Sequence, residues 1–364
     1  MTRRLGVAGA IWTASLLLSR LIGLVRERTL GRTLGAGVEA DVYAAAFRIP
    51  DLFFYLLAGG ALSIVFIPIF TAHLERGDER RAWRSFSVIA NTLLVAALAL
   101  IPALLWAMPS LTRLAAPGFT GEQAEHLVRL TRIVLPAQIF HMIGGLLGAS
   151  LLARDRHIVP ALSPLLYNIG IIAGGLISGS AEGFAWGVLA GAFAGSFALP
   201  LWVCLRGGLK WTPAFSVSDP DLRDWLRMSL PIMLGWSIVA MDDPLITRFA
   251  SRLGAGETAL LNYAKTLMRV PMGVFGAAMA YAAYPTLARL FAQGRTAELR
   301  GALASAIERV LLLAFASQVI LTAGGPEIGT LVYTARRIPP ADLETLGLYL
   351  SLFSVGLPAW SLQI

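Results

Sequence analysis

Long apolar stretches separated by short polar connections make up most of the sequence. The hydrocarbon core of a bilayer, about 30 Å thick, needs about 20 apolar residues per helix. The stretches reach that length and show no alternation, so strands are excluded. We predict an all-α polytopic membrane protein with about ten transmembrane helices, at Leu5–Leu34, Val42–Ala72, Phe86–Met108, Leu127–Ala153, Pro160–Ile177, Phe184–Leu205, Trp225–Ala250, Tyr263–Ala292, Ala302–Ala323 and Leu343 to the end.

Composition supports a membrane protein and excludes most other classes. Hydrophobic residues make up 56% of the 364 residues and charged residues 14%, against about 25% charged in an average soluble domain. A disordered chain, a coiled coil and a disulfide scaffold are therefore excluded. The net charge is +8. In so apolar a chain we assign this excess to loops or a polar pathway, not to nucleic-acid binding.

Basic residues gather in alternate connections, which predicts the orientation of the chain. The N-terminus and the second, fourth, sixth and eighth connections are the basic ones, and the alternation weakens toward the C-terminus. Because Lys and Arg are enriched in cytoplasmic loops, we predict a cytoplasmic N-terminus. The residues concerned are Arg3, Arg4, Arg76, Arg80, Arg81, Arg84, Arg154, Arg156, Arg206, Lys210, Arg223, Arg227, Arg289, Arg295 and Arg300.

Short motifs recur at a nearly constant separation of 217 to 222 positions. The sequence Leu-Gly-Ala-Gly at 34–37 returns at 253–256, and Arg48-Ile-Pro50 is echoed by Arg269-Val-Pro271. The alternative is coincidence between Gly and Pro residues. We favour two lobes in parallel orientation, an N-terminal six-helix lobe at 1–210 and an incomplete lobe of about four helices at 211–364. Since the second copy would continue past the last residue, we expect a longer transporter.

Charged side chains inside the first predicted span are candidates for a substrate pathway. An ionisable group within the bilayer costs several kcal/mol unless it faces a cavity or a partner. Ser19, Arg20, Arg26 and Glu27 follow the mostly apolar stretch Leu5–Leu18. Arg20 and Glu27 are seven apart and share a helix face, while Arg26 lies about 120° away. The alternative is a helix that ends at Arg20 and continues as an interfacial loop.

The second span carries Asp41 and then Arg48-Ile-Pro50-Asp51. Proline removes a backbone donor, and irregular backbone at membrane depth is tolerated only where it lines a cavity or is buried in protein. We therefore place Arg48 at a discontinuity that lines a cavity. The alternative is that Arg48 and Asp51, three residues apart, only pair with each other.

Further charged candidates lie in the second half of the chain. Lys265 and Arg269 are spaced i, i+4, so both can face one cavity. Asp242 and Asp243 precede Pro244 and could form a cation or proton site, neutralise a basic cavity, or mark a polar helix break. Surplus arginine predicts an anionic substrate, because guanidinium groups bind phosphate and carboxylate through paired hydrogen bonds.

The sequence offers no enzyme chemistry and calls for no bound cofactor. Asp242-Asp243 is followed by Ile246 and Thr247, so the Asp-rich metal spacing of prenyl transferases fails. The four histidines have no metal-ligand spacing, and Cys204 is read as an apolar filler. We expect a transporter that is not an enzyme, whose energy could come from the membrane potential, protons or sodium ions.

Several separated motifs resemble the MurJ (MviN) lipid II flippases of the multidrug/oligosaccharidyl-lipid/polysaccharide exporter superfamily. They are Ser19-Arg-Leu-Ile-Gly-Leu-Val-Arg26, Leu34-Gly-Ala-Gly37, Phe47-Arg-Ile-Pro50, Ala58-Gly-Gly-Ala-Leu62, Phe66-Ile-Pro68, Ala116-Pro-Gly-Phe119, Leu261-Asn-Tyr-Ala264 and Pro271-Met-Gly-Val-Phe-Gly276. The resemblance implies fourteen helices, as two six-helix lobes and two further helices that form a lipid groove.

The resemblance also implies a function in cell-wall peptidoglycan synthesis at the bacterial inner membrane. The substrate would be lipid II, an undecaprenyl-pyrophosphate carrying a disaccharide-pentapeptide, moved outward by alternating access, with the cell-wall synthesis machinery as a further partner. Ser19, Arg20, Arg26 and Asp41 fall on matching family positions. Arg20 and Arg26 would hold the pyrophosphate, and Asp41 would be a gate or orienting partner. Glu27 replaces an aspartate of some members.

The chain also departs from the family pattern. Phe54 stands where members carry a cavity arginine, Gly59 replaces a glutamate, and Thr266 replaces another arginine, with Lys265 and Arg269 beside it as substitutes. An exporter of another lipid-linked oligosaccharide or polysaccharide remains the alternative. A cation-drug exporter would require acidic cavity residues, which Arg20 and Arg26 argue against.

Overall fold

The computed structural model describes residues 18–19, 21–59, 61–273, 277–333 and 338–362. Every regular element in these ranges is helical, which confirms the all-α class. The chain divides into two compact units, Met1–Thr258 and Ala259–Ile364. The boundary between these units falls later than the end of the lobe predicted at residue 210, because the helices of residues 220–250 pack on helices of the first unit. The two-lobe repeat stays a prediction.

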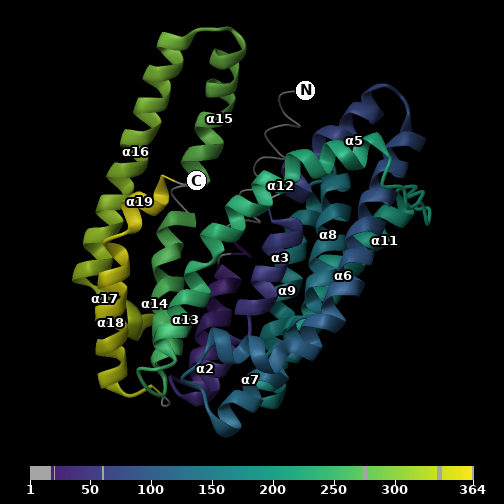
Figure 1. Ribbon diagram of the computed structural model, residues 1–364. Helices are drawn as coiled ribbons and strands as arrows, with labels where there is room; N and C mark the ends of the chain where they lie inside the picture. Colours follow the sequence, from purple (N-terminus) through teal and green to yellow (C-terminus); the bar gives the residue numbers. More distant parts are fainter. Residues whose placement is uncertain (1–17, 20, 60, 274–276, 334–337, 363–364) are drawn as a thin grey trace. The chain divides into compact units, whose positions relative to one another are not determined.

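The first unit holds most of the helices (Figure 1). Residues 21–34 are helical. They are followed by α2 (Val38–Ala45), α3 (Arg48–Ala58), α4 (Ala61–Ile64), α5 (Phe66–Glu75), α6 (Glu79–Ala115), α7 (Gly121–Val134), α8 (Ala137–Leu152), α9 (Ile158–Ser178), α10 (Ala181–Gly191), the π-helical segment η1 (Ala192–Ala198), α11 (Leu199–Arg206), α12 (Pro220–Ala240) and α13 (Asp242–Ala250).

The second unit begins within α14 (Glu257–Pro271). It continues with α15 (Ala277–Ala292), α16 (Thr296–Ala323), α17 (Gly325–Tyr333), α18 (Pro340–Ser354) and α19 (Leu357–Ser361). In this unit α15 and α16 run side by side, as do α17 and α18 (Figure 1).

Seven helical stretches in the described residues are long and apolar enough to cross a membrane. They overlap seven of the ten predicted spans, and lie at Val38–Glu75, Glu79–Ala115, Gly121–Leu152, Ile158–Ser178, Ala181–Arg206, Pro220–Ala250 and Thr296–Ala323. Residues 5–17 and 20 of the predicted first span lie outside the described residues, and so does the middle of the eighth, at 274–276. The tenth corresponds to α18 and α19, which are separate helices. The count of ten stays a prediction.

Prolines explain why two predicted spans are divided. Pro50 has no N–H to offer the carbonyl of Ala46, and the chain turns at residues 46–47 between α2 and α3. Pro358 likewise leaves the carbonyl of Ser354 without its helical partner, and α18 ends there. The discontinuity expected beside Arg48 is thus present, at the N-terminal end of α3.

Glycines allow α9 and α10 to pack backbone to backbone. Gly170 and Gly174 on α9 face Gly187 and Gly191 on α10, and a Cβ added to Gly187 would lie 2.5 Å from the carbonyl oxygen of Gly170. Spacing of small residues at i, i+4 is typical of close helix pairs in membranes. The two helices therefore pack closely against each other in the first unit.

Aromatic side chains fill the core where α5 meets α6. Trp83 packs edge-on against Phe70 and Phe86, with ring centroids 5.2 and 5.6 Å apart, and Phe66 lies 5.3 Å from Phe70. All four side chains are buried. Cys204 of α11 is also buried, as expected of an apolar filler, and its Sγ lies 3.6 Å from Ser150 Oγ.

Candidate functional site

The predicted Arg26 and Glu27 form an ion pair in the first helix. Arg26 Nη2 lies 2.6 Å from Glu27 Oε1, and Arg26 Nε donates to the same oxygen at 3.2 Å. Glu27 is buried, with 7% of its surface exposed. Arg26 itself is half-buried, with 29% of its side chain exposed. The guanidinium next to the buried carboxylate offsets part of the cost of removing that charge from water.

Asn168 of α9 holds the other side of Arg26. Its Oδ1 accepts a hydrogen bond from Arg26 Nη1 at 3.1 Å, while its Nδ2 donates to the carbonyl of Pro164 at 2.8 Å. The amide is thus fixed at both ends, and it fixes the plane of the guanidinium. The sequence analysis missed Asn168. The available signal was a lone amide in an apolar span, which is costly in a membrane unless it has a partner.

The remaining first-helix candidates are less fully placed. Ser19 is in a helical, half-buried position. Arg20 lies outside the described residues, so its place beside Arg26 is not tested. Phe54, which the resemblance aligns with a cavity arginine, packs edge-on against His141 with ring centroids 6.4 Å apart, and His141 in turn contacts Tyr167 at 5.1 Å.

Arg48 bonds to side chains of α13, far along the chain. Its Nε donates to Thr247 Oγ1 at 2.8 Å, and its Nη1 lies 3.7 Å from Asp243 Oδ1. Arg48 and Thr247 are buried, whereas Asp51, the partner considered within α3, is exposed. The Arg48–Asp243 pair supports the reading of Asp243 as a neutraliser of positive charge. Asp242 is half-buried next to it.

Asp41 links the two Leu-Gly-Ala-Gly motifs. Its carboxylate is fully buried, and Oδ2 accepts a hydrogen bond from the backbone N–H of Gly256 at 2.6 Å. Gly256 has φ +93°, a conformation that favours glycine. A Cβ at Gly256 would lie 2.5 Å from the carbonyl oxygen of Ala36, so the two motifs touch directly.

In the second unit, Lys265 and Arg269 have different surroundings. Lys265 is 2% exposed, and its Nζ lies 5.3 Å from the ring centroid of Trp360, within the range of a cation–π contact. Arg269 is exposed and Thr266 half-buried. Trp360 was not anticipated from the sequence, which gives no hint that α19 reaches α14.

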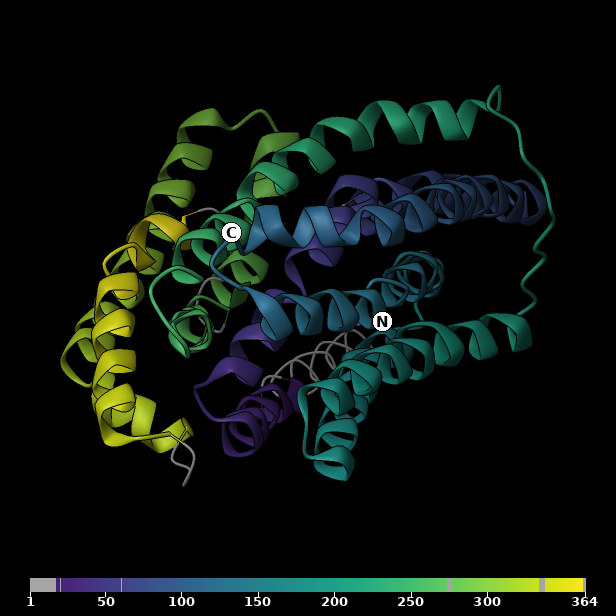
Figure 2. The same cartoon turned by 60° about the horizontal axis from the view of Figure 1, so that its bottom comes forward.

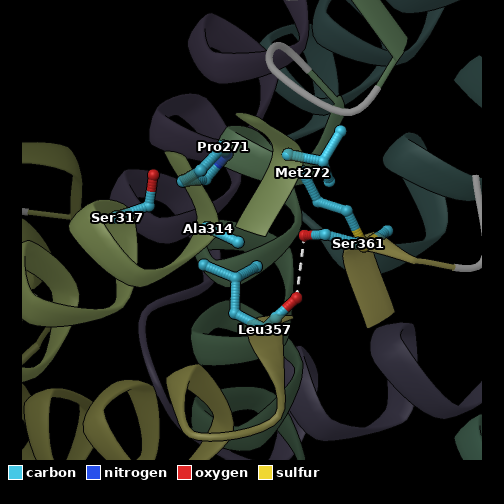
Figure 3. Close-up of a pocket in the computed structure, with 7 residues that line it drawn as sticks. Pro271, Met272, Ala314, Ser317, Leu357 and Ser361 are labelled. Atoms are coloured by element: carbon cyan, nitrogen blue, oxygen red, sulfur yellow. Dashed lines mark hydrogen bonds between the residues drawn. The ribbon is translucent and has the colours of Figure 1, made fainter. Parts of the chain in front are cut away.

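A crevice in the second unit lies at the C-terminal end of α14 (Figure 3). Apolar atoms dominate its walls, so it offers no charge to an anion. The lining residues are Pro271, Met272, Val310, Ala314, Ser317, Leu357 and Ser361.

Comparison with known proteins identifies the family. The family model for the lipid II flippase MurJ matches residues 30–364. The chain belongs to the MurJ family. Relatives described as probable lipid II flippase MurJ include one from Rhizobium tropici, 27% identical over 94% of this chain and 66% of the relative. Another, from Rickettsia prowazekii, is 27% identical over 98% of this chain and 71% of the relative.

Two solved transporter structures share the fold of this chain. A lipid II flippase MurJ in an inward closed conformation aligns with a TM-score of 0.81 at 19% identity, over 97% of this chain and 73% of that one. An inward-facing MATE multidrug transporter of the MOP superfamily gives 0.69 at 17% identity, over 97% and 83%. The chain spans about two thirds, 66%, of the length of the Rhizobium tropici relative.

Proposed function

We propose that this protein takes part in moving lipid II across the bacterial inner membrane as a flippase. Its membership in the MurJ family over residues 30–364 is the observation that carries the proposal. The Arg26–Glu27 pair supports it, because the half-buried guanidinium is held within a membrane protein and can reach an anionic headgroup. Transport of this kind needs no covalent chemistry, so the proposed protein is a transporter and not an enzyme.

The proposed role of Arg26 is to bind the pyrophosphate of the substrate. In this structure Glu27 accepts two of its hydrogen bonds. A pyrophosphate oxygen pair can accept the same donors bidentately, so the substrate would exchange with Glu27. Asn168 would keep the guanidinium plane in place during the exchange. Ser19 and Arg20 extend this cradle in the proposal, as the family resemblance implies.

Asp41 is proposed as the gate residue of the first unit. Its hydrogen bond to Gly256 joins the start of α2 to the turn before α14. Opening this contact would leave a buried carboxylate and a backbone N–H without their hydrogen bond. The contact therefore stabilises the conformation in which it is formed, and other interactions have to offset its loss in any conformation that lacks it.

The finer topology also belongs to the proposal. We place the N-terminus in the cytoplasm, ten spans of a two-lobe arrangement in this chain, and the cell-wall synthesis machinery as a partner. Energy would come from the membrane potential, protons or sodium ions. The contact between Asp243 and Arg48 favours charge neutralisation over ion binding at that aspartate.

Replacement of Arg26 tests the proposal. Arg26→Ala and, separately, Arg20→Ala should abolish complementation of a strain depleted of its own lipid II flippase. Each variant should also weaken lipid II binding by the purified protein at least tenfold, which corresponds to a loss of about 1.4 kcal/mol of binding free energy. Arg26→Lys should also fail, since ammonium cannot bind bidentately. Arg80→Ala, at an exposed arginine, is the control.

Two outcomes would contradict the proposal. One is normal growth and binding of both alanine variants. The other is tighter binding of a different undecaprenyl-pyrophosphate sugar than of lipid II, which would identify an exporter of another lipid-linked oligosaccharide.

A further inference from the structure

The connection between α11 and α12, residues 207–219, has no regular helix and follows an extended path (Figure 2). We name it the strap. Arg154, just after α8, holds its beginning: Nη1 donates to the carbonyl of Gly207 at 2.8 Å, and Nη2 lies 3.3 Å from Glu79 Oε1. The same guanidinium lies over the ring of Trp83, 5.5 Å from its centroid. The strap therefore begins beside the first turns of α6.

The middle of the strap is bonded to a part of α6 further along that helix. Asn91 Nδ2 donates to the carbonyls of Thr212 and Ala214 at 2.9 and 2.8 Å, and Ser87 Oγ accepts from the N–H of Thr212 at 3.1 Å. Pro213 has no N–H to satisfy. At this point α6 thus supplies hydrogen-bond partners for the irregular backbone of the strap.

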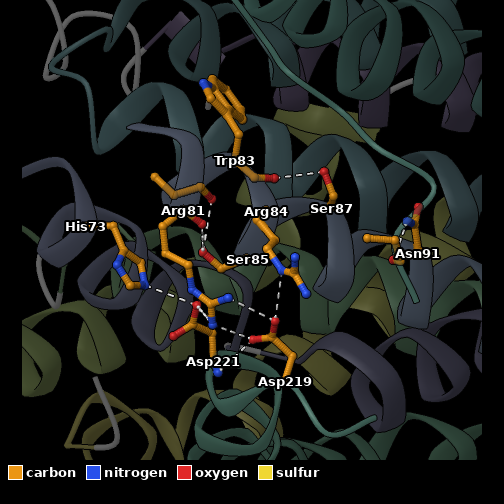
Figure 4. A network of polar contacts seen from close by, with 11 residues as sticks. His73, Arg81, Trp83, Arg84, Ser85, Ser87, Asn91, Asp219 and Asp221 are labelled. Atoms are coloured by element: carbon orange, nitrogen blue, oxygen red, sulfur yellow. Dashed lines mark hydrogen bonds and ion pairs between the residues drawn. The ribbon is translucent and has the colours of Figure 1, made fainter. Parts of the chain in front are cut away.

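The end of the strap returns to the beginning of α6 (Figure 4). Arg81 contacts both carboxylate oxygens of Asp219, at 2.7 and 3.1 Å, and Arg84 Nε lies 3.4 Å from Oδ2. Asp221 Oδ2 lies 2.8 Å from Arg81 and 3.1 Å from His73. Both ends of the strap are therefore fixed at the polar start of α6.

The order of these attachments shows that the strap dips along α6. Because a helix rises 1.5 Å per residue, Asn91 lies about 12 Å further along the axis than Trp83. It also lies beyond the basic Arg81 and Arg84 and within the predicted third span, Phe86–Met108. Irregular backbone at membrane depth is tolerated where protein provides its hydrogen bonds, and Asn91 provides them. The middle of the strap is therefore level with the apolar part of α6.

The strap holds apolar side chains outward in and after its deepest part. Trp211, Phe215 and Val217 are 52%, 55% and 65% exposed. The one polar atom of the Trp211 side chain, Nε1, already donates to Asn91 Oδ1 at 2.9 Å, so the exposed part of the ring is apolar. Three such side chains held outward would be costly in water. Tryptophan is instead typical of the headgroup level of a membrane.

The charges beside this apolar surface are basic. Arg206 and Lys210 are exposed, and the Arg206 guanidinium lies over the ring of Trp202, 4.3 Å from its centroid. The sequence contains no acidic residue between Glu182 and Asp219. Anionic phospholipids attract lysine and arginine that lie close to the membrane surface. The surface thus has the charge and the apolar side chains that suit a lipid leaflet.

We propose that the strap lies in the headgroup layer of the membrane and binds the phospholipids of that leaflet. Trp211, Phe215 and Val217 reach the upper part of the acyl chains. Arg206 and Lys210 pair with the phosphates of anionic phospholipids. The strap thereby connects α11 to α12 within the membrane surface and not through the aqueous phase. This inference goes beyond the proposed function, because it concerns the lipids around the protein and requires no transported substrate.

The accessibility of spin labels tests where the strap lies, in a Cys204→Ala background and in nanodiscs of phosphatidylethanolamine and phosphatidylglycerol. The three labelled positions are exposed. A label at Phe215→Cys should be relaxed more by oxygen than by a water-soluble nickel chelate, as should a label at Val95→Cys in the apolar part of α6. A label at Arg80→Cys, at the polar start of α6, should show the opposite order.

Two results would overturn the proposal. A label at Phe215→Cys that behaves as the label at Arg80→Cys would place the strap in water. A label there that is shielded from both reagents would show that protein, not lipid, covers the strap.

Titration with phosphatidylglycerol tests the two cations, in purified protein in a neutral detergent with phosphatidylcholine as the reference lipid. Arg206→Ala combined with Lys210→Ala should weaken binding of phosphatidylglycerol at least about tenfold and leave binding of phosphatidylcholine unchanged. Arg76→Ala combined with Arg80→Ala removes two exposed cations near the turn between α5 and α6 and is the matched control. Its affinity for phosphatidylglycerol should stay within about twofold of the wild type.

Unchanged affinity of the first double variant, or an equal loss in both, would contradict binding of phosphatidylglycerol by Arg206 and Lys210. Neither experiment uses lipid II. Failure of lipid II binding would therefore overturn the proposed function without altering these results.

Discussion

The buried contacts of Arg26 show how single residues determine the candidate site. Its partner Glu27 is adjacent in the sequence and could be named from the charge pattern alone. Asn168 is 142 positions away, and nothing in a local pattern predicts that α9 brings an amide to the first helix. Charged residues in apolar spans are visible in a sequence because each is costly without a partner. The identity of that partner requires the fold.

Replacement of Asn168 tests its role as the support of Arg26. Asn168→Ala should destabilise the protein by about 1.5–3 kcal/mol, the value of a hydrogen bond to a charged group, and should weaken lipid II binding. Thermal unfolding and a binding titration measure the two effects. Thr29→Val, which removes an exposed side-chain bond to the carbonyl of Val25, is the control. Equal behaviour of both variants would show that Asn168 does not support Arg26.

The carboxyl of Asp219 lies 2.7 Å from Arg81 and 3.4 Å from Arg84, and it predicts how these ion pairs respond to pH. Burial alone would raise the pKa of this group, but hydrogen bonds from Arg81, from the Asp221 N–H and from Arg84 hold it below its ordinary value. The stabilisation is therefore complete above the pKa of an unfolded aspartate, about 3.9, and is lost as pH falls through the lower folded-state value. Asp219→Asn should lower the unfolding temperature at pH 7. In strong acid the unfolding temperatures of the variant and the wild type should become equal. A difference that persists there would contradict this assignment.

At the scale of the elements, apolar length predicted where helices lie, and proline predicted where they break. The interruption before α3 follows from Pro50 and was expected from the sequence. The division of the last predicted span at Pro358 follows the same rule, but apolar length concealed it. Hydropathy cannot reveal that the connection at 207–219 is tied to α6, since those bonds depend on Asn91 and Arg81 facing it.

The glycine contact between α9 and α10 makes a prediction at this scale. Gly187→Ala would place a methyl group 2.5 Å from the carbonyl oxygen of Gly170, so the helices have to separate, at a cost of about 1–3 kcal/mol. Gly235→Ala on α12 meets no atom within 4 Å and should be neutral or stabilise slightly, because alanine favours a helix interior over glycine. Thermal unfolding in detergent compares the two; a neutral Gly187→Ala would mean that the helices are not in close contact.

At the scale of the whole molecule, the sequence identified the class and the family resemblance, whereas the compact units follow from packing. The predicted boundary at residue 210 came from motifs that recur in the sequence. The boundary of the units at Thr258 reports contacts. The difference between them is that α12 and α13 pack on helices of the first unit although the repeat assigns them to the second lobe.

The contact between Asp41 and Gly256 can be tested at this scale. Asp41→Ala removes an acceptor from a buried N–H, at a cost of about 1–3 kcal/mol, and should impair complementation. Asp41→Asn keeps an oxygen acceptor and should retain more of both stability and growth. If the two variants behave alike, the hydrogen bond to Gly256 is not what makes Asp41 important.

The two Leu-Gly-Ala-Gly motifs meet at Ala36 and Gly256, so two segments of identical sequence are in contact. Contacts of this kind are usual where identical subunits associate, and here both partners belong to one polypeptide. Evolution cannot change either motif independently, because a bulkier residue in one copy must be accommodated by the other. We therefore expect substitutions at these positions to occur in pairs among relatives.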